Sequence, residues 1–232
     1  MAEAAAIAAS PAAAGRQRGP QTQAEIRRAA VDLFARLGYH ATSMRAIAAA
    51  AGVGPGAIYH WYPSKEAILV ELQDDFMTEL EAQVDAAVAR QSRPALRLAA
   101  AVREHVVFHG HHQRWAFATD SEIRALGEPS RAALVAKRDA YQARFTEMIR
   151  DGSRDGDLRT SEARVATYAI LLQCTGVALW FAPAGPLSLE EVAELHVELV
   201  LGSLQASPRL IGEAIAAVSR RPTVPTPEEE SP

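Results

Sequence analysis

Residues 42–66 hold two short segments, each enclosed by residues that start or stop a helix. Thr42 can cap the first segment through its side-chain oxygen, and Gly52 can adopt the left-handed backbone conformation that ends it. Pro55 suits the first position of a second helix, because its fixed φ is already helical and its missing N–H is not needed there. That second helix should end near Trp61. Two short helices joined by a tight turn form a helix-turn-helix.

A longer helix is predicted just before this motif. Thr22 and Glu25 have the spacing of a capping box, and Gly38 follows the last apolar residue of the pattern. The three helices can bury one small core, so residues 20–66 are predicted to form a domain. The side chains expected in that core are Ile26, Ala30, Leu33, Phe34 and Leu37 of the first helix and Ile47, Ala51, Val53, Ile58 and Trp61 of the motif.

The second helix of a helix-turn-helix enters the major groove of DNA, and flanking polar groups hold phosphates. The base-facing positions would be 54–57, where no residue has a long polar side chain. Hydrogen-bonded reading of bases would therefore depend largely on Arg45. The predicted DNA contacts are Gly54, Pro55, Gly56 and Ala57 at the bases, Arg45 with Thr42, Ser43 and His60 as readers, and Tyr59, His60 and Lys65 at phosphates.

The charge distribution agrees with a DNA-binding N-terminal end. The whole chain carries a net charge of −4, which by itself argues against a nucleic-acid partner. Residues 1–70, however, hold seven basic side chains and four acidic ones, so this part is net positive and the remainder is negative. The positive end is the end that carries the motif.

The residues around the motif resemble the N-terminal signature of TetR-family transcriptional regulators. The matching runs are Leu33-Phe34-Ala35, Gly38-Tyr39, Thr42-Ser43-Met44-Arg45-Ala46-Ile47-Ala48, Ala51-Gly52-Val53, Gly56-Ala57-Ile58-Tyr59 and Tyr62-Pro63-Ser64-Lys65-Glu66-Ala67-Ile68-Leu69. The resemblance implies an all-α homodimer with a DNA-binding head and a C-terminal domain that holds an effector pocket and the dimer interface. The alternative is a structural three-helix unit without a DNA role, since such shapes also occur in proteins that bind no DNA.

The rest of the chain is also predicted to be helical, so the predicted fold class is all-α. No glycine or proline interrupts residues 64–90, where apolar residues recur every four positions, so one helix of ~40 Å is predicted. Further helices are predicted at 94–111, 113–126, 129–151, 160–182 and 188–206. They would form a ligand-binding and dimerisation domain over residues 67–218, between disordered tails at 1–19 and 219–232.

The last two long helices are the predicted dimer contacts, because small and apolar residues there would let helices pack closely across a two-fold axis. These residues are Gly176, Val177, Leu189, Val192, Leu195, Leu199, Gly202 and Ser203. An ordinary intramolecular bundle would explain the same pattern.

Aromatic and polar side chains of the second domain are candidates for the lining of an effector pocket. The predicted ligand-binding residues are Phe76, His105, Phe108, His109, Trp115, Tyr141, Phe145, Tyr168, Gln173 and Trp180, with Thr175 as a further polar contact. For each aromatic residue, plain core packing is the competing interpretation. Arg131, Lys137 and Arg138 could pair with phosphates of a ligand or form a solvated face.

Residues 105–126 and 173–205 resemble the C-terminal domain of family members that sense acyl-CoA thioesters in fatty-acid or sterol breakdown. The similar features are a histidine cluster, Trp115 before an acidic helix, and Trp180 followed by Gly185-Pro186-Leu187. The alternative effector is a planar cationic drug, as in regulators of efflux, which would need buried acids. Glu104, Asp120 and Glu122 are the available ones.

Other chemistries find less support in the sequence. His105 and His109 share a helical face and could bind a metal, but no further ligand follows at a fixed spacing. The single cysteine, Cys174, excludes an internal disulfide, fits a reducing cytoplasm and has the apolar neighbours of a buried residue. No nucleophile with its base and no phosphate-cradling glycine loop is apparent, so neither an enzyme nor a cofactor is predicted.

The sequence therefore predicts a cytoplasmic homodimer that binds a palindromic DNA operator and is released by a small lipophilic effector such as an acyl-CoA. The N-terminal stretch is too weakly apolar for a signal peptide or a span, so no membrane partner is expected. The alternatives are a drug-responsive efflux repressor and, in a different class, an architectural DNA-binding protein that responds to no ligand.

Overall fold

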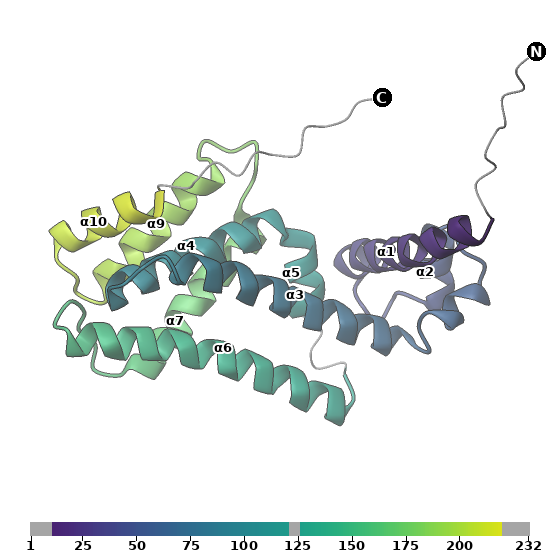
Figure 1. Ribbon diagram of the computed structural model, residues 1–232, viewed down its shortest axis with the longest axis horizontal. Helices are drawn as coiled ribbons and strands as arrows, with labels where there is room; N and C mark the ends of the chain where they lie inside the picture. Colours follow the sequence, from purple (N-terminus) through teal and green to yellow (C-terminus); the bar gives the residue numbers. More distant parts are fainter. Residues whose placement is uncertain (1–10, 121–125, 220–232) are drawn as a thin grey trace, which may run out of the picture.

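The computed structural model describes residues 11–120 and 126–219, with residues 11–20 and 120 by backbone alone. Within these residues the chain is helical and contains no strand, which confirms the all-α prediction. Figure 1 shows a small head at one end and a larger helical body at the other, joined by helix α3, Lys65–Val88. The head contains α1, Pro11–Leu37, α2, Met44–Ala50, and η1, Ala57–His60.

Helix α1 is longer than the sequence predicted. It begins at Pro11, so residues 11–19 differ from the expected disordered tail, and Thr22 lies inside the helix instead of capping it. Proline suits the first turn of a helix and the alanines after it are strong helix formers, which explains the earlier start. Gly38 ends α1 as predicted, with a φ of +82°. Residues 1–10 and 220–232, where the tails were predicted, lie outside the described residues.

The two short elements of the motif differ from the prediction in detail. Ser43, and not Thr42, caps α2, because its Oγ accepts the backbone N–H of Ala46 at 3.1 Å. Gly52 makes the predicted turn at a φ of +69°. The second element is a single turn of 3-10 helix, η1, which begins after Gly56 and not at Pro55. The motif is thus shorter than a pair of regular helices.

The body has α4, Pro94–His111, at its centre, buried over nearly its whole length. Around it lie α5, Gln113–Asp120, α6, Glu128–Arg154, α7, Ala163–Thr175, α8, Val177–Trp180, α9, Leu189–Ser203, and α10, Pro208–Ser219. The predicted helix 160–182 is broken at Gly176 into α7 and α8. Helix α10 was not predicted as a separate element. It packs against α4 and α9 in the corner seen in Figure 1.

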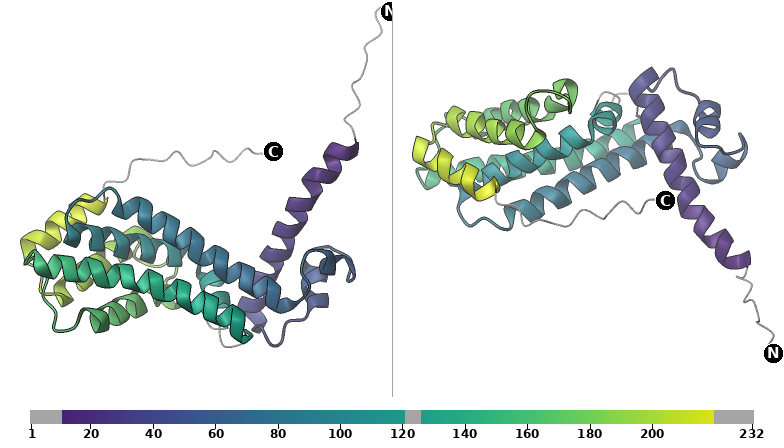
Figure 2. Two further views of the ribbon diagram at one scale, coloured as in Figure 1. Left: turned by 60° about the horizontal axis from the view of Figure 1, so that its bottom comes forward. Right: turned by 90° about the horizontal axis from the view of Figure 1, so that it is seen from above.

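The head and the body share part of their apolar core. The head core of Ile26, Phe34 and Ile47 continues into Leu72 of α3 and includes Leu134 of α6. The two views in Figure 2 show α1 crossing the end of the body at a steep angle. The predicted domain division at residue 66 stays a prediction, and the shared core indicates that the two units are mechanically connected.

Three polar contacts reinforce this connection. The indole Nε1 of Trp115 donates to the backbone carbonyl of Leu72 at 3.0 Å, which ties α5 to α3. Arg114 of α5 pairs with Asp32 of α1 at 3.0 Å. The backbone N–H of Gly127, just before α6, donates to the Glu66 carboxylate at 2.8 Å. Helix α5 is therefore bonded both to α3 and to α1 of the head.

Candidate functional site

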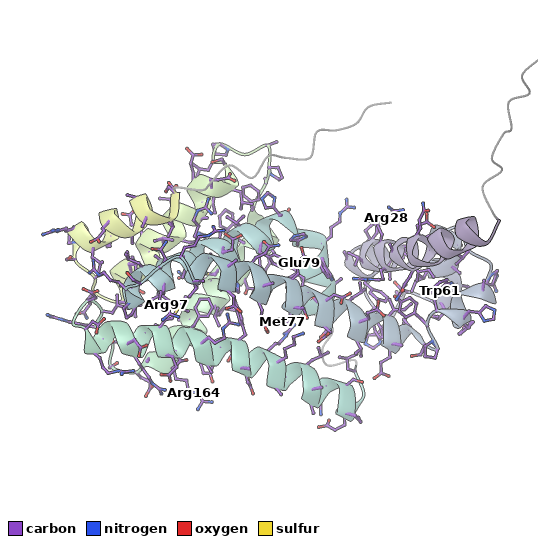
Figure 3. All side chains as sticks on the ribbon, viewed as in Figure 1. Arg28, Trp61, Met77, Glu79, Arg97 and Arg164 are labelled. Carbon is purple, nitrogen blue, oxygen red and sulfur yellow. The ribbon has the colours of Figure 1, made fainter. Side chains whose placement is uncertain are left out.

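The outer end of the head presents most of the predicted DNA contacts. Ser43, Arg45, Gly54, Pro55, Gly56, Ala57, Tyr59 and His60 are all exposed there. In Figure 3, Trp61 marks this end, opposite the end of the body where Arg97 lies. The exposed set comes from α2, the turn and η1, so one surface carries the candidate readers and the candidate phosphate contacts. Their contacts with DNA stay a prediction.

Thr42 has a structural role. Its side chain is 2% exposed, and its hydroxyl donates to the backbone carbonyl of Gly38 at 2.9 Å. A hydroxyl that is buried and already bonded is directed into the head and not toward a base, so the DNA contact of Thr42 stays a prediction that this geometry does not favour. The hydroxyl closes the loop between α1 and α2, which places Ser43 at the start of α2.

The side chain of Lys65 also does not point outward, as the predicted phosphate contact would require. Its Nζ donates to the carbonyl oxygens of Tyr39 and Thr42 at 2.5 and 2.6 Å, and it lies 4.2 Å from the centre of the Tyr39 ring. An ammonium bonded to two backbone carbonyls is directed into the protein rather than outward. The sequence could not show this, because the three residues meet only in the folded head.

Two apolar residues expected in the head core face solvent instead. Leu37 is 53% exposed and Trp61 is 37% exposed. Helix η1 ends at His60, and the residue that turns inward after Ile58 is Tyr62 rather than Trp61. The Tyr62 hydroxyl donates to Glu71 at 2.8 Å, and burial raises its pKa to about 12. Trp61 thereby joins the candidate DNA-binding surface.

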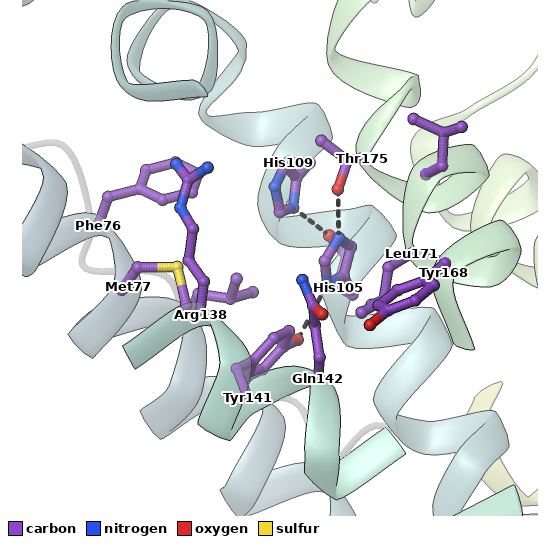
Figure 4. A pocket seen from close by; sticks show the side chains of 12 residues that line it. Phe76, Met77, His105, His109, Arg138, Tyr141, Gln142, Tyr168, Leu171 and Thr175 are labelled. Carbon is purple, nitrogen blue, oxygen red and sulfur yellow. Dashed lines mark hydrogen bonds between the residues drawn. The ribbon is translucent and has the colours of Figure 1, made fainter. Parts of the chain in front are cut away.

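The body contains a cavity of about 330 Å³ between α3, α4, α6 and α7. Figure 4 shows side chains from these helices converging on it. Five of the predicted ligand-binding residues line it: Phe76, His105, His109, Tyr141 and Tyr168. Its other lining residues are Met77, Leu80, Arg138, Gln142, Leu171, Leu172 and Thr175. Apolar walls with a few polar groups are typical of a small-molecule site.

A hydrogen-bonded chain of three side chains crosses the wall of this cavity. Nδ1 of His105 lies 2.9 Å from the Tyr141 hydroxyl, and Nε2 lies 3.0 Å from the Thr175 hydroxyl (Figure 4). Burial lowers the pKa of His105 well below its usual value and raises the pKa of Tyr141 well above its own. The imidazole is therefore neutral, with one nitrogen donating and the other accepting, so the chain can be ordered in either direction.

The other predicted ligand-binding residues do not line the cavity. Phe108 and Phe145 are buried core residues that pack against Phe76 and His105 respectively. Trp115 packs edge-on against Phe76 from behind the cavity wall. Gln173 is exposed on α7, and Trp180 is 57% exposed and stacks on His196. The aromatic pattern marks apolar residues, but the helix faces decide which of them reach the cavity.

Sequence reasoning missed Met77, Leu80, Leu171 and Leu172 because it searched for aromatic and polar types. Leu80 lies four residues after Phe76 and three after Met77 on α3, and this helical spacing could have indicated it. Among the basic candidates, Arg138 lines the cavity. Lys137 is bonded to Asp74 and Thr78 instead, and Arg131 pairs with Glu128.

The acids proposed for a cationic drug find no support at this cavity. Glu104 lies on another face of α4 and does not line the cavity. The side chains of Asp120 and Glu122 lie outside the described residues. No aspartate or glutamate of the described residues is among the lining side chains.

The metal and redox alternatives also receive no geometric support. Within residues 11–120 and 126–219, no group of three or more His, Cys, Asp or Glu side chains is placed to hold a metal. His105 and His109 stack at 4.1 Å, and Nδ1 of His109 bonds to the backbone oxygen of His105. Cys174 is buried, as predicted, and burial raises its pKa to about 12, which disfavours the reactive thiolate.

Helices α7 to α9 carry many exposed apolar side chains. Large apolar side chains of α7, α8, α9 and the loop before α9 are exposed: Val165, Tyr168, Leu172, Leu179, Trp180, Leu187, Leu195 and Leu199. Leu195 and Leu199 were predicted dimer contacts. Val177, Leu189 and Val192 were also predicted, but they are buried inside the body. We call this exposed set the α7–α9 face.

The α7–α9 face overlaps a stretch that passes a simple test for a membrane span. Residues Ala163–Trp180 are long and apolar enough to cross a bilayer by length and composition, and 22% of the stretch is buried. That stretch is divided by the break at Gly176 between α7 and α8. An apolar protein surface of this kind also marks an interface between subunits.

Two family models match the chain. Residues 26–72 match the model described as bacterial regulatory proteins, tetR family, and residues 91–204 match the tetracyclin repressor-like C-terminal domain. The first match covers the helix-turn-helix head, and the second covers α4 to α9.

Curated relatives and solved structures agree with these matches. The chain is 26% identical over 185 residues to the HTH-type transcriptional repressor KstR2 of Mycolicibacterium smegmatis, covering 79% of this chain and 90% of the relative. A tetR-family regulatory protein from Rhodococcus RHA1 is similar in structure, with a TM-score of 0.76, 29% identity and coverage of 81% and 98%. AibR in complex with isovaleryl coenzyme A and operator DNA has a TM-score of 0.69, 26% identity and coverage of 77% and 97%.

Proposed function

Because this chain belongs to the TetR family of bacterial regulatory proteins, we propose that it is a homodimeric repressor released from a palindromic operator by an effector in the α3–α4–α6–α7 cavity. Family membership confirms the prediction of a DNA-binding regulator rather than an enzyme. The operator would be held by the exposed end of the head around α2 and η1. A protein of this kind works in the cytoplasm, where its DNA is.

The observation that carries the proposal is a series of packing contacts and an ion pair that connect the cavity wall to the head. Phe76 lines the cavity and packs against Trp115 of α5 at 5.2 Å between ring centres. Helix α5 in turn packs against α1 and pairs with it through Arg114 and Asp32. An effector that moves Phe76 would displace α5 and therefore α1.

Such a displacement would act on the spacing of the two heads in a dimer. Half-sites one helical turn apart are separated by ~34 Å, so both heads can bind only if their separation matches the DNA. The effector must bind one arrangement better than the other, since a ligand with equal affinity for both would shift nothing.

The cavity favours a compact acyl group with an anionic or polar attachment. Its walls are Phe76, Leu80 and Leu171, while Arg138 supplies a positive charge at the edge. A volume of about 330 Å³ is near the lower end of ligand pockets, which suits a short acyl chain. AibR, whose complex contains isovaleryl coenzyme A, is a structural relative at 26% identity. We therefore propose a short acyl-CoA as the effector.

The two alternatives are less well supported. A cationic drug would be expected to meet an acid, and no acid among the described residues lines the cavity. An architectural DNA-binding protein would have no need of a cavity lined by a neutral His105 bonded to Tyr141 and Thr175.

The experiment is a fluorescence-anisotropy titration of the purified protein on DNA from upstream of its own gene, with a scrambled duplex as reference. We expect sequence-preferring binding that isovaleryl-CoA or another short acyl-CoA reverses, while free CoA and a planar cation do not. Tyr141→Phe should weaken the response to acyl-CoA and leave binding in the absence of effector unchanged. Release by the cation but by no acyl-CoA would contradict the proposed effector. No preference for the upstream DNA at low salt would contradict the repressor function.

A further inference from the structure

A second cavity lies between the C-terminal end of α3, the middle of α4 and the C-terminal end of α10. It has a volume of about 210 Å³ and shares no lining residue with the effector cavity. Its lining residues are Ala87, Arg90, Gln91, Ala100, Arg103, Glu104, Ala217 and Val218. We call it the α10 pocket. Charged side chains make up more of its wall than in the effector cavity.

The central feature of the α10 pocket is a buried guanidinium. Arg103 is 5% exposed, and its Nε has no hydrogen-bond partner. Its ion pair with Glu104 is long, at 3.8 Å between Nη1 and Oε2. The guanidinium group of arginine has donors but no acceptor, so only an acceptor group can complete its hydrogen bonds. A buried N–H of a cation that lacks an acceptor is costly, and an anionic group would complete its hydrogen bonds.

The neighbouring charges favour an anion as that group. Arg90, in the turn that follows α3, lines the same cavity and adds a second positive charge, while Glu104 supplies the one negative charge among the lining residues. The local balance is therefore positive. The planar guanidinium matches the geometry of carboxylate and phosphate oxygens, to which it can donate two parallel hydrogen bonds.

The size of the cavity limits the ligand. Liquid water occupies ~30 Å³ per molecule, so the α10 pocket has room for about seven waters. Inorganic phosphate or a small carboxylate fits such a space, whereas a nucleotide or a coenzyme does not. We propose that the α10 pocket binds a small oxyanion, a free phosphate or a small carboxylate, on the guanidinium of Arg103.

This site would stabilise the corner of the body where α10 packs against α4 and α9. It requires neither DNA binding nor an effector, so its test is independent of the proposed function. Ligand binding to the folded state alone raises stability in proportion to the logarithm of ligand concentration above the dissociation constant.

The test is thermal unfolding and isothermal titration calorimetry of the full chain with sodium phosphate and, separately, sodium acetate, at constant ionic strength against sodium chloride. We expect a saturable rise in Tm and a measurable heat of binding with at least one oxyanion. Arg103→Gln should weaken the binding by about tenfold or more, as expected for lost charge-assisted hydrogen bonds. Arg97→Gln, which removes the same charge from an exposed position on α4, should bind as the parent does.

Two further variants keep the test decisive if Arg103→Gln folds poorly. Ala217→Leu should narrow the cavity from α10 and reduce binding, and Arg90→Gln should weaken it several-fold by removing the second charge. An equal rise in Tm in the parent and in Ala217→Leu would indicate a general salt effect and overturn the proposal.

The chain also carries its own carboxylates after α10, at Glu228, Glu229 and Glu230. A variant in which all three are replaced by Gln tests whether the chain's own carboxylates, rather than an added oxyanion, occupy the α10 pocket. If the parent binds no oxyanion and the triple variant does, the proposal of a free ligand in the parent is wrong. If both bind alike, a free oxyanion is the ligand. Absence of binding in both overturns the site.

Discussion

Nζ of Lys65 lies 2.6 Å from the backbone carbonyl oxygen of Thr42, so the first residue of α3 holds the loop that leads into α2. The same ammonium donates to the carbonyl of Tyr39 at 2.5 Å. The long helix that lines the effector cavity through Phe76 is thus bonded at its other end to the loop before the candidate readers Ser43 and Arg45. A tilt of α3 would move that loop directly.

Lys65→Met should weaken binding to all DNA sequences through the loss of this connection. We expect the free energy of DNA binding to become weaker by about 1.5–3 kcal/mol, because the variant loses hydrogen bonds made by a charged group. The slope of log affinity against log salt should stay that of the parent, since the ammonium points inward. Arg28→Met removes an exposed cation of the same head as a control (Figure 3). A slope reduced by about one in Lys65→Met would mean that this lysine contacts phosphate.

Arg45→Ala should reduce the discrimination between operator and scrambled DNA. The side chain is exposed on α2 at the end of the head and is the one long donor among the candidate readers. We expect a loss of about 1–3 kcal/mol of discrimination, measured by anisotropy on both duplexes. Arg36→Ala, an equal charge change on the exposed side of α1, should leave discrimination intact. Parent-like discrimination in Arg45→Ala would place base reading elsewhere.

Leu199→Glu should convert the proposed dimer into a monomer. Leu199 is 62% exposed in the α7–α9 face, and burying a carboxylate in a subunit interface without a partner is strongly unfavourable. Val135→Glu, at a residue of α6 that is 42% exposed and outside this face, is the control. Light scattering after size-exclusion chromatography measures the mass. A parent that is already monomeric at micromolar concentration would contradict the interface.

Stability should fall on acidification below about pH 6.5, in part through His105. Burial lowers its folded-state pKa, so its contribution is complete above the unfolded value of 6.5 and is lost as pH falls toward the lower folded-state pKa. Each such group contributes up to about 1.4 kcal/mol per pH unit in that window. His112 has a lowered pKa for the same reason. Urea unfolding at pH 7.5 and 5.5 should show a smaller pH effect in His105→Gln than in the parent; an unchanged effect would exclude His105.

Gln73→Met should make the protein more stable. The Gln73 side chain is 1% exposed, and neither its Oε1 nor its Nε2 has a hydrogen-bond partner. Replacing an unsatisfied buried amide by an apolar side chain of similar length should add about 1–3 kcal/mol to the free energy of unfolding. Gln83→Met on the same helix, where the amide bonds to Glu79 near the surface, should change stability little. A less stable Gln73→Met would show that the amide is satisfied in solution.

The positions where helices end were largely predictable, because they depend on residues that act locally. The predicted bounds of α4, 94 and 111, are those observed, since Pro94 suits a first helical position. Gly38 and Gly52 adopt the left-handed conformations that their positions implied. Among the exceptions was α1, where alanines before Thr22 continue the helix although a capping box could have started it there.

The sequence by itself determined an all-α chain with a basic helix-turn-helix head, since caps, turns and apolar spacing are properties of neighbours along the chain. Only the tertiary structure decided which side chains meet. Lys65 reaches the carbonyl of Thr42, Phe108 faces the core while Phe76 faces the cavity, and Arg103 is buried beside α10. Those outcomes follow from the angles at which helices distant in sequence pack together, and no local pattern encodes these angles.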